Sequence, residues 1–237
     1  MEIEFASMRQ IDHRELIHER LAGSFEHLLS AYDTQRRVET LVDEFLGSAR
    51  LIGKRALDVG CGAGHFSKRL TELGAQVIGC DLGPELVQQT RQFGGCEAVV
   101  ADALNLSDFF ETNFFDVVVS SECIEHTPQP YVAVSQMARV LKSGGFLAVS
   151  TPNLLWWPVV KVATMAKLRP FDGFENFSTW RGLRCAFENE GLDIVEERGL
   201  HLFPFQFGFH GLSTWIDGHF QGMRAAMINI CLLGRKR

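Results

Sequence analysis

The apolar positions of the chain form short continuous runs separated by longer amphipathic stretches. Runs that are apolar on both faces predict strands covered by helices on two sides. Five such runs, built mainly from Val, Ile, Leu and Ala, are RALDVG (55–60), QVIGCD (76–81), EAVVAD (97–102), FDVVVSSE (115–122) and FLAVSTP (146–152).

The stretches between these runs carry apolar residues at helical spacing. Phe66 and Leu70 share one helix face, Pro84 opens the next helix, and Gly144–Gly145 ends the helix before the fifth strand. Strands that alternate with helices of this length predict parallel pairing with right-handed crossovers. Residues 55–152 therefore predict a doubly wound α/β sheet.

The two ends of the chain depart from this alternation. Residues 12–49 have helical periodicity, and two late strands, DIVEERGL and MINICLLGRKR, surround a Phe-rich segment. The predicted organisation has N-terminal helices at 1–50, which would cover a cofactor site of the core, and a core at 51–237. Within the core we expect an apolar helical insertion at about 153–176 and a Phe-rich insertion at about 201–222.

Composition narrows the class of protein. The 237 residues include 46% hydrophobic and 22% charged residues, and the formal net charge is −6. An acidic chain without a Lys/Arg stripe argues against nucleic-acid binding, because basic groups supply most of that affinity. Six cysteines without a CxxC pair, a charged N-terminus without a signal-like apolar region, and no apolar run of about 18 residues predict a cytoplasmic protein.

The turn after the first strand, DVGCGAGHF, combines glycines with an acidic residue. Gly60, Gly62 and Gly64 leave room for backbone to approach a ligand, and Asp58 adds a carboxylate at the strand end. A nicotinamide dinucleotide site needs a further glycine at position 65, where this chain has His65. A carboxylate at the turn favours a positively charged ligand over a pyrophosphate.

Two more strands end in carboxylates. Asp81 follows Gly60 by 21 residues, the position at which a carboxylate can accept both hydroxyls of a ribose. Asp102 ends the third strand, within reach of an adenine edge. Since S-adenosylmethionine carries a sulfonium, an amino group, a ribose and an adenine, these acidic strand ends predict a site for it.

Four ordered motifs carry a resemblance to a known family. ALDVGCGAGHFSKRLTELGAQVIGCDLGPELV, VVADALNL, FDVVVSSECIEH and RVLKSGGFLAVSTPN together resemble a class I S-adenosylmethionine-dependent methyltransferase over roughly 50–200. Within that superfamily the chain looks most similar to the ubiquinone-biosynthesis O-methyltransferases. The resemblance implies a Rossmann-like sheet of seven mostly parallel strands with an antiparallel last strand, which the two late strands fit.

The resemblance also implies a set of cofactor contacts. Asp58, Gly60 and Gly62 would lie near the methionine moiety, Asp81 would bind the ribose, and Asp102 with Ala103 the adenine. Arg37 resembles the upstream arginine that contacts the cofactor in this family. The remaining implied contacts are Cys61, Leu82 and Ser120.

The stretch SSECIEHTPQP follows the fourth strand, where an acceptor would dock. Glu122, Glu125 and His126 offer two oxygens and a nitrogen, suited to Mg²⁺ or Zn²⁺, and the family resemblance implies a metal site. His126 could instead be a general base without a metal. The third interpretation is structural, with Glu125 and His126 orienting the loop by hydrogen bonds.

Two apolar segments bear on the acceptor. NLLWWPVVKVATMAKLRP predicts a helix apolar on most sides, which either packs deeply or contacts lipid. In HLFPFQFGFHG, alternate phenylalanines would share one side of an extended chain and form core packing or a pocket wall. Three histidines are alternative bases: His201, His210 and His219.

These features predict methyl transfer to a small apolar or quinone-like acceptor on a hydroxyl oxygen. The acceptor could carry a lipid tail, with peripheral contact to a membrane. An N- or C-methyltransferase of specialised or lipid metabolism is the alternative within enzymes. A non-catalytic cofactor-binding partner protein is the alternative outside them. The oligomeric state has no signal in the sequence.

Overall fold

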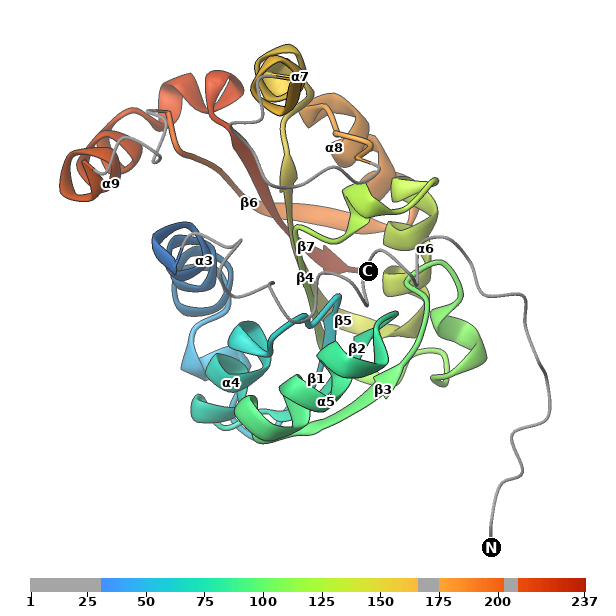
Figure 1. Cartoon of the computed structure of the whole chain (residues 1–237). Coiled ribbons are helices and arrows are strands. Elements are labelled where there is room, and N and C mark those ends of the chain that lie inside the picture. Colours follow the sequence, from blue (N-terminus) through green and yellow to red (C-terminus); the bar gives the residue numbers. More distant parts are fainter. Residues whose placement is uncertain (1–30, 166–174, 203–208) are drawn as a thin grey trace, which may run out of the picture.

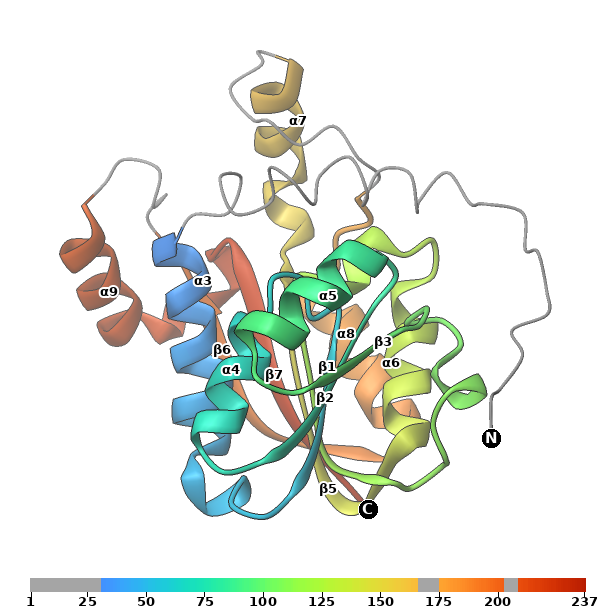
Figure 2. The same ribbon diagram turned by 60° about the horizontal axis from the view of Figure 1, so that its bottom comes forward.

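The structure, a computed structural model, describes residues 31–165, 175–202 and 209–237. A single seven-stranded sheet runs through these residues, with helices on both of its faces (Figures 1 and 2). The strands, in chain order, are β1 (Arg55–Val59), β2 (Gln76–Asp81), β3 (Glu97–Val100), β4 (Phe115–Ser121), β5 (Leu141–Pro152), β6 (Leu192–Leu200) and β7 (Asn229–Lys236).

The sheet order is β3-β2-β1-β4-β5-β7-β6. β1 pairs in parallel with β2 and β4, and β2 with β3 and β4 with β5 pair in parallel as well. β7 is antiparallel to both β5 and β6. This confirms the predicted fold, including the antiparallel last strand. The strand order reverses between β1 and β4, and ligands of open α/β sheets bind at the carboxyl ends of strands beside such a point.

Helices cover the sheet between successive strands. The α-helices are α3 (Ala31–Val38), α4 (His65–Glu72), α5 (Pro84–Phe93), α6 (Pro130–Val140), α7 (Trp157–Met165), α8 (Trp180–Asn189) and α9 (His210–His219). The shorter or differently wound turns are the π-helix η1 (Glu39–Leu46) and the 3-10 turns η2 (Ser48–Arg50), η3 (Leu106–Asp108), η4 (Ile124–His126), η5 (Leu154–Trp156) and η7 (Gln221–Ala226).

Two hydrophobic cores explain why the strand runs are apolar throughout. Leu57 and Val118 face one core, to which α6 and α8 contribute. Ala56, Val117 and Val119 face the other, to which η1 and α4 contribute. Because neighbouring residues of a strand point to opposite faces, both sets must be apolar.

The boundary between α6 and β5 differs from the prediction. The helix ends at Val140, and β5 starts at Leu141, so Gly144–Gly145 lies inside a strand. Phe115 pairs with Leu141, and the register shifts directly after this pair. A Cβ on Gly145 would lie 2.8 Å from the carbonyl oxygen of Asp116. The glycines therefore allow a bulged strand to approach β4, which their helix-ending pattern did not reveal.

The three predicted regions outside the core sheet are described in part. Residues 1–30 lie outside the described residues, and α3 and η1 confirm helix in the later part of the N-terminal region. The apolar insertion begins with η5 and α7, and 166–174 lies outside the described residues. Phe203, Phe205 and Phe207 also lie outside them, so their alternation stays a prediction.

Within 31–165, 175–202 and 209–237, the structure holds no helix with both the length and the apolar character needed to cross a membrane.

Candidate functional site

The glycine-rich turn after β1 has a backbone that only glycine adopts easily. The φ angles of Gly60, Gly62 and Gly64 are 74°, 52° and 90°. A Cβ on Gly60 would lie 2.5 Å from both Cβ and Sγ of Cys123, in the loop after β4. A side chain at Gly60 would therefore collide with the loop that contains Cys123. The sequence had suggested instead that the glycine leaves room for a ligand.

Asp81 holds the turn in place from the end of β2. Its two carboxylate oxygens accept hydrogen bonds of 3.0 Å from the backbone nitrogens of Gly62 and Gly83. The side chain is mostly buried at the carboxyl edge of the sheet. The carboxylate predicted to bind ribose thus also organises the backbone around it.

Asp58 lies one residue before the end of β1 and is more enclosed than the sequence indicated. Its side chain is 2% exposed, and its Oδ2 accepts a 2.6 Å hydrogen bond from Ser67 Oγ on α4. Burial raises the pKa of Asp58 to about 7, although the hydrogen bond from Ser67 opposes this. A positive charge nearby would favour its ionised form.

The other predicted cofactor residues lie around the same strand ends. Asp102 follows β3 by two residues, and its Oδ1 accepts from Leu104 N at 2.9 Å, while Ala103 beside it is buried. Leu82 directly follows β2 and is half-buried. Two side chains are turned into the protein: Cys61 Sγ accepts from Thr90, and Ser120 Oγ donates to the carbonyl of Val59. The role of each residue in cofactor binding stays a prediction.

Arg37 lies on α3 and reaches the end of β4. It is 4% exposed, and its guanidinium donates to Ser121 Oγ at 2.9 Å and to Asp33 Oδ2 at 2.9 Å. Its buried Nε has no hydrogen-bond partner among the described residues. A buried cation with an unsatisfied N–H fits an anionic ligand group, such as the carboxylate of an amino acid.

Glu122 directly follows β4 with a left-handed backbone, at a φ of 50°. Its backbone nitrogen donates to the carbonyl of Ser150, and Ser150 Oγ donates to its Oε1 at 3.2 Å. Burial raises the pKa of Glu122, against the opposing charge of Arg37. Its carboxylate therefore faces β5 and α3.

Glu125 and His126 lie on the turn η4. Glu125 is buried, its Oε2 accepts from Thr151 Oγ1 at 3.2 Å, and its Oε1 lies 3.9 Å from Nε2 of the partly exposed His126. Burial and the nearby charge of Glu122 raise the pKa of Glu125 well above its usual range. A buried carboxyl that holds its proton more tightly than usual, beside a more accessible imidazole, is an arrangement that can handle a proton.

The predicted metal site does not fit this arrangement. Among the described residues, no three His, Cys, Asp or Glu side chains are grouped so that they could hold a metal ion. Ser150 orients Glu122 and Thr151 orients Glu125, while Nε2 of the partly exposed His126 lies 3.9 Å from Oε1 of Glu125. The spacing in the sequence brings the three residues near one another but does not make their side chains converge.

The three histidines considered as alternative bases have different surroundings. His201 is buried completely. His210 is exposed and stacks on Tyr32 with ring centroids 4.0 Å apart, and His219 is exposed with its Nδ1 2.8 Å from the carbonyl of Trp215. The burial of His201 excludes direct contact with an acceptor in this structure.

The donor set as a whole fits S-adenosylmethionine. The carboxyl groups of Asp58 near the end of β1 and Glu122 directly after β4 suit its sulfonium and amino group, Asp81 at the end of β2 suits its ribose, and Arg37 suits its carboxylate. A family model of a methyltransferase domain matches residues 57–149. A ubiquinone biosynthesis O-methyltransferase of Xanthomonas oryzae pv. oryzae is 44% identical over 171 residues, which cover 67% of this chain and 72% of that protein.

The chain belongs to the class I S-adenosylmethionine-dependent methyltransferases. A second relative of this methyltransferase, a ubiquinone biosynthesis O-methyltransferase of Burkholderia ambifaria, is 41% identical over 169 residues and covers 66% of this chain and 72% of its own. Membership in this family makes the protein an enzyme, so the non-catalytic interpretation is set aside.

Solved structures agree on the fold of the methyltransferase. A magnesium protoporphyrin IX methyltransferase of Synechocystis PCC 6803 with bound S-adenosylmethionine has a TM-score of 0.65 at 14% identity, covering 98% of this chain and 100% of that one. An S-adenosylmethionine-dependent methyltransferase of Thermotoga maritima has a TM-score of 0.64 at 16% identity, covering 94% and 99%. At such identities the likeness shows a common fold.

Sequence reasoning missed two acidic residues near the site of the methyltransferase. Asp33 pairs with Arg37 four residues later on α3, a spacing that could have been read as a helical ion pair. Asp217 on α9 accepts hydrogen bonds from the backbone nitrogens of His201 and Leu202. No local pattern announces the second contact, because its partners lie on a different element.

Proposed function

We propose that this methyltransferase methylates a hydroxyl oxygen of a small apolar or aromatic, quinone-like acceptor. The observation that carries the proposal is the pair of Glu125 and His126 at the carboxyl end of β4, with Nε2 and Oε1 3.9 Å apart. A phenolic or similar hydroxyl must lose its proton when its oxygen is methylated. The names of the two relatives above, both O-methyltransferases, support the same acceptor atom.

The cofactor would be held by the strand ends. Asp81 would accept the ribose hydroxyls, Asp102 and Ala103 would contact the adenine, and Arg37 would bind the carboxylate of the methionine moiety. When bound, S-adenosylmethionine supplies an electrophilic methyl group on a positively charged sulfur. The ionised form of Asp58 stabilises the positive charge of the cofactor.

His126 would remove the proton of the acceptor hydroxyl through an imidazole nitrogen. The positive charge that then forms on His126 lies close to the carboxyl group of Glu125 and favours ionisation of that group. Thr151 fixes the orientation of Glu125 by its 3.2 Å hydrogen bond. The chain therefore supplies a base and a group that stabilises the base once it is charged.

The acceptor could carry a lipid tail. α7 follows the carboxyl end of β5 after the short turn η5 and stands away from the sheet (Figure 2). Leu155 before the helix and Val159, Val162 and Met165 on it are each more than half exposed. Apolar side chains exposed beside the site support an acceptor delivered from a membrane surface by a protein that otherwise stays in the cytoplasm.

The test uses labelled S-adenosylmethionine with a panel of catechols, quinols and lipid extracts. We expect methyl ether products, and we expect His126→Gln to lower kcat about 100-fold or more with little change in cofactor affinity. An N-methyltransferase gives a different result, since a neutral amine needs no base. Methylated amines formed at an undiminished rate by the His126 variant at high pH would replace the oxygen assignment.

A further inference from the structure

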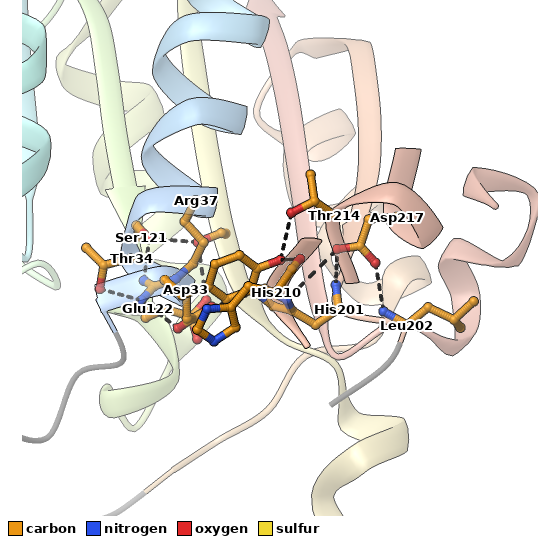
Figure 3. A network of polar contacts seen from close by, with 12 residues as sticks. Asp33, Thr34, Arg37, Ser121, Glu122, His201, Leu202, His210, Thr214 and Asp217 are labelled. Carbon is orange, nitrogen blue, oxygen red and sulfur yellow. Dashed lines mark hydrogen bonds and ion pairs between the residues drawn. The ribbon is translucent and has the colours of Figure 1, made fainter. Parts of the chain in front are cut away.

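A polar network joins three segments that are distant in the sequence (Figure 3). On α3, Arg37 donates to Asp33, and it also donates to Ser121 at the end of β4. On its other side Asp33 meets His201, which directly follows β6, and His201 meets Asp217 of α9. The network thus leads from the carboxyl end of β4 to the C-terminal insertion.

His201 is the central link on the insertion side. It is 0% exposed, and its Nε2 lies 2.8 Å from Asp33 Oδ1. Its backbone nitrogen donates to Asp217 Oδ2 at 2.9 Å, and its Nδ1 lies 3.9 Å from the same oxygen. Its backbone carbonyl accepts from Ile228. Backbone and side chain of His201 are therefore both fixed.

Asp33 connects His201 to Arg37 through its two carboxylate oxygens. Burial would raise the pKa of Asp33, but the charge of Arg37 and the hydrogen bond from His201 outweigh it and lower the pKa to about 2. An ionised carboxylate only accepts hydrogen bonds, so Nε2 of His201 carries the hydrogen of this pair. The same carboxylate accepts from Arg37 through its other oxygen at 2.9 Å.

A left-handed backbone occurs at His201 in the network and at Glu122, next to Ser121. Among the described residues, the non-glycine residues with positive φ are Asn113, Glu122 and His201, and the φ of His201 is 62°. Asn and His adopt this conformation more readily than most residues, whereas Glu122 does so at a cost of about 1 kcal/mol or more. Such conformations persist where surrounding contacts enforce them and concentrate at functional sites.

We propose that His201 is a positioning residue, which acts through Asp33 to hold Arg37 in the orientation that binds the cofactor. Without the hydrogen bond from His201, the carboxylate of Asp33 can rotate away from Arg37. Arg37 then loses its charged hydrogen-bond partner on α3, and its Nη2 keeps only the longer 3.4 Å contact with Thr34 Oγ1 among these bonds. The inference rests on the assignment of Arg37 to the cofactor carboxylate made above.

The test measures the Kd of S-adenosylhomocysteine by titration calorimetry, which needs no acceptor. We expect His201→Ala to weaken binding about tenfold, because one charge-assisted contact loses its alignment. His201→Gln should stay within about threefold, since its amide nitrogen can reach Asp33 as Nε2 does. The matched control, His219→Gln, changes an exposed histidine of α9 and should bind as the parent protein does.

A double variant separates positioning from general damage to the fold. If His201 acts through Arg37, His201→Ala should weaken binding by less than about twofold when added to Arg37→Gln. Should His201→Ala fail to fold in a thermal melt, Asp33→Asn breaks the same link from α3 with an isosteric side chain. We expect it to weaken binding about tenfold as well.

Three results would overturn the inference. The first is that folded His201→Ala binds S-adenosylhomocysteine as tightly as the parent protein while Arg37→Gln binds it weakly. If His201→Ala does not fold, the same result with Asp33→Asn counts. Either result leaves the assignment of Arg37 intact. Another is full additivity of the His201 and Arg37 effects. The third is unchanged binding by Arg37→Gln, which removes the assignment of Arg37 together with the inference.

Discussion

Replacing Asp58 by asparagine should change how the stability of the methyltransferase depends on pH. In the folded protein without ligand, burial raises the pKa of Asp58 from 3.8 to about 7. The folded state then binds the proton more tightly than the unfolded state, so the free energy of unfolding falls as the pH rises between these two pKa values. Asparagine does not titrate, and its Oδ1 can still accept the hydrogen bond from Ser67.

The size of the effect follows from the shift. A rise of about three units in the pKa of Asp58 corresponds to about 4 kcal/mol of unfolding free energy. This amount is lost as the pH rises over the whole interval between the two pKa values. Between about pH 5 and about pH 8, the expected loss is about 2.5 kcal/mol. The difference in unfolding free energy between Asp58→Asn and the parent protein should therefore grow by about this amount over that range, in favour of the variant.

Urea denaturation followed by circular dichroism at several pH values measures this difference. Asp116→Asn is the matched control. Burial would raise the pKa of Asp116, but the hydrogen bond from Lys142 outweighs it and lowers the pKa. Asp116 is then ionised in both states above about pH 5, so its difference curve should stay flat.

A flat difference curve for Asp58→Asn would refute the reasoning. It would mean that Asp58 is solvated or paired with a positive group in the ligand-free protein. Its carboxylate would then ionise easily without a positively charged ligand. A curve that grows in favour of the parent protein as the pH rises would refute it as well, because it would show a lowered pKa.

Three further predictions concern packing and the exposed insertion. Gly60→Ala should lower the unfolding free energy by about 3 kcal/mol or more, since a Cβ would lie 2.5 Å from Cys123, whereas Gly53→Ala, with a φ of 70° and no atom within 4 Å, should cost only about 1 kcal/mol. Equal losses for the two variants in urea denaturation would contradict this. Phe187→Ala should cost about 3–5 kcal/mol by the same assay, because the ring is fully buried in the core, and a loss under about 1 kcal/mol would contradict its packing. Val162→Ser should leave the melting temperature unchanged, because the side chain is 66% exposed, and should reduce co-sedimentation with anionic lipid vesicles. Undiminished co-sedimentation would remove α7 from the proposed lipid contact.

The sheet was predictable because its signal is repeated and local. β2 has the predicted bounds 76–81, and the continuous apolar runs reflect the two cores of the structure. The start of β5 was not predictable, because Gly144–Gly145 ends helices in many proteins, and here allows a bulge against β4. Only the neighbouring strand distinguishes these two uses of glycine.

The cofactor side of the site was also largely readable, because the carboxyl ends of parallel strands meet at one edge of the sheet. Asp81 lies there, as its position at the end of an apolar run indicated. The acceptor side was less readable. Glu122, Glu125 and His126 are within five positions of one another, yet Ser150 and Thr151 of β5 orient the two carboxyl groups, and among the described residues they form no group with His126 that could hold a metal ion.

The sequence by itself determined the succession of strands and helices along the chain, the glycine turn and the acidic residues at or just after the strand ends, since each depends on residues close together in the chain. The tertiary structure alone decided what those side chains face. The contact between His201 and Asp33 spans 168 positions, and it exists because α3 and the segment after β6 pack against the same side of the carboxyl ends of the strands. Partners of buried charges are chosen by which elements enclose them, because a charge removed from water must find its partner wherever the packing provides one.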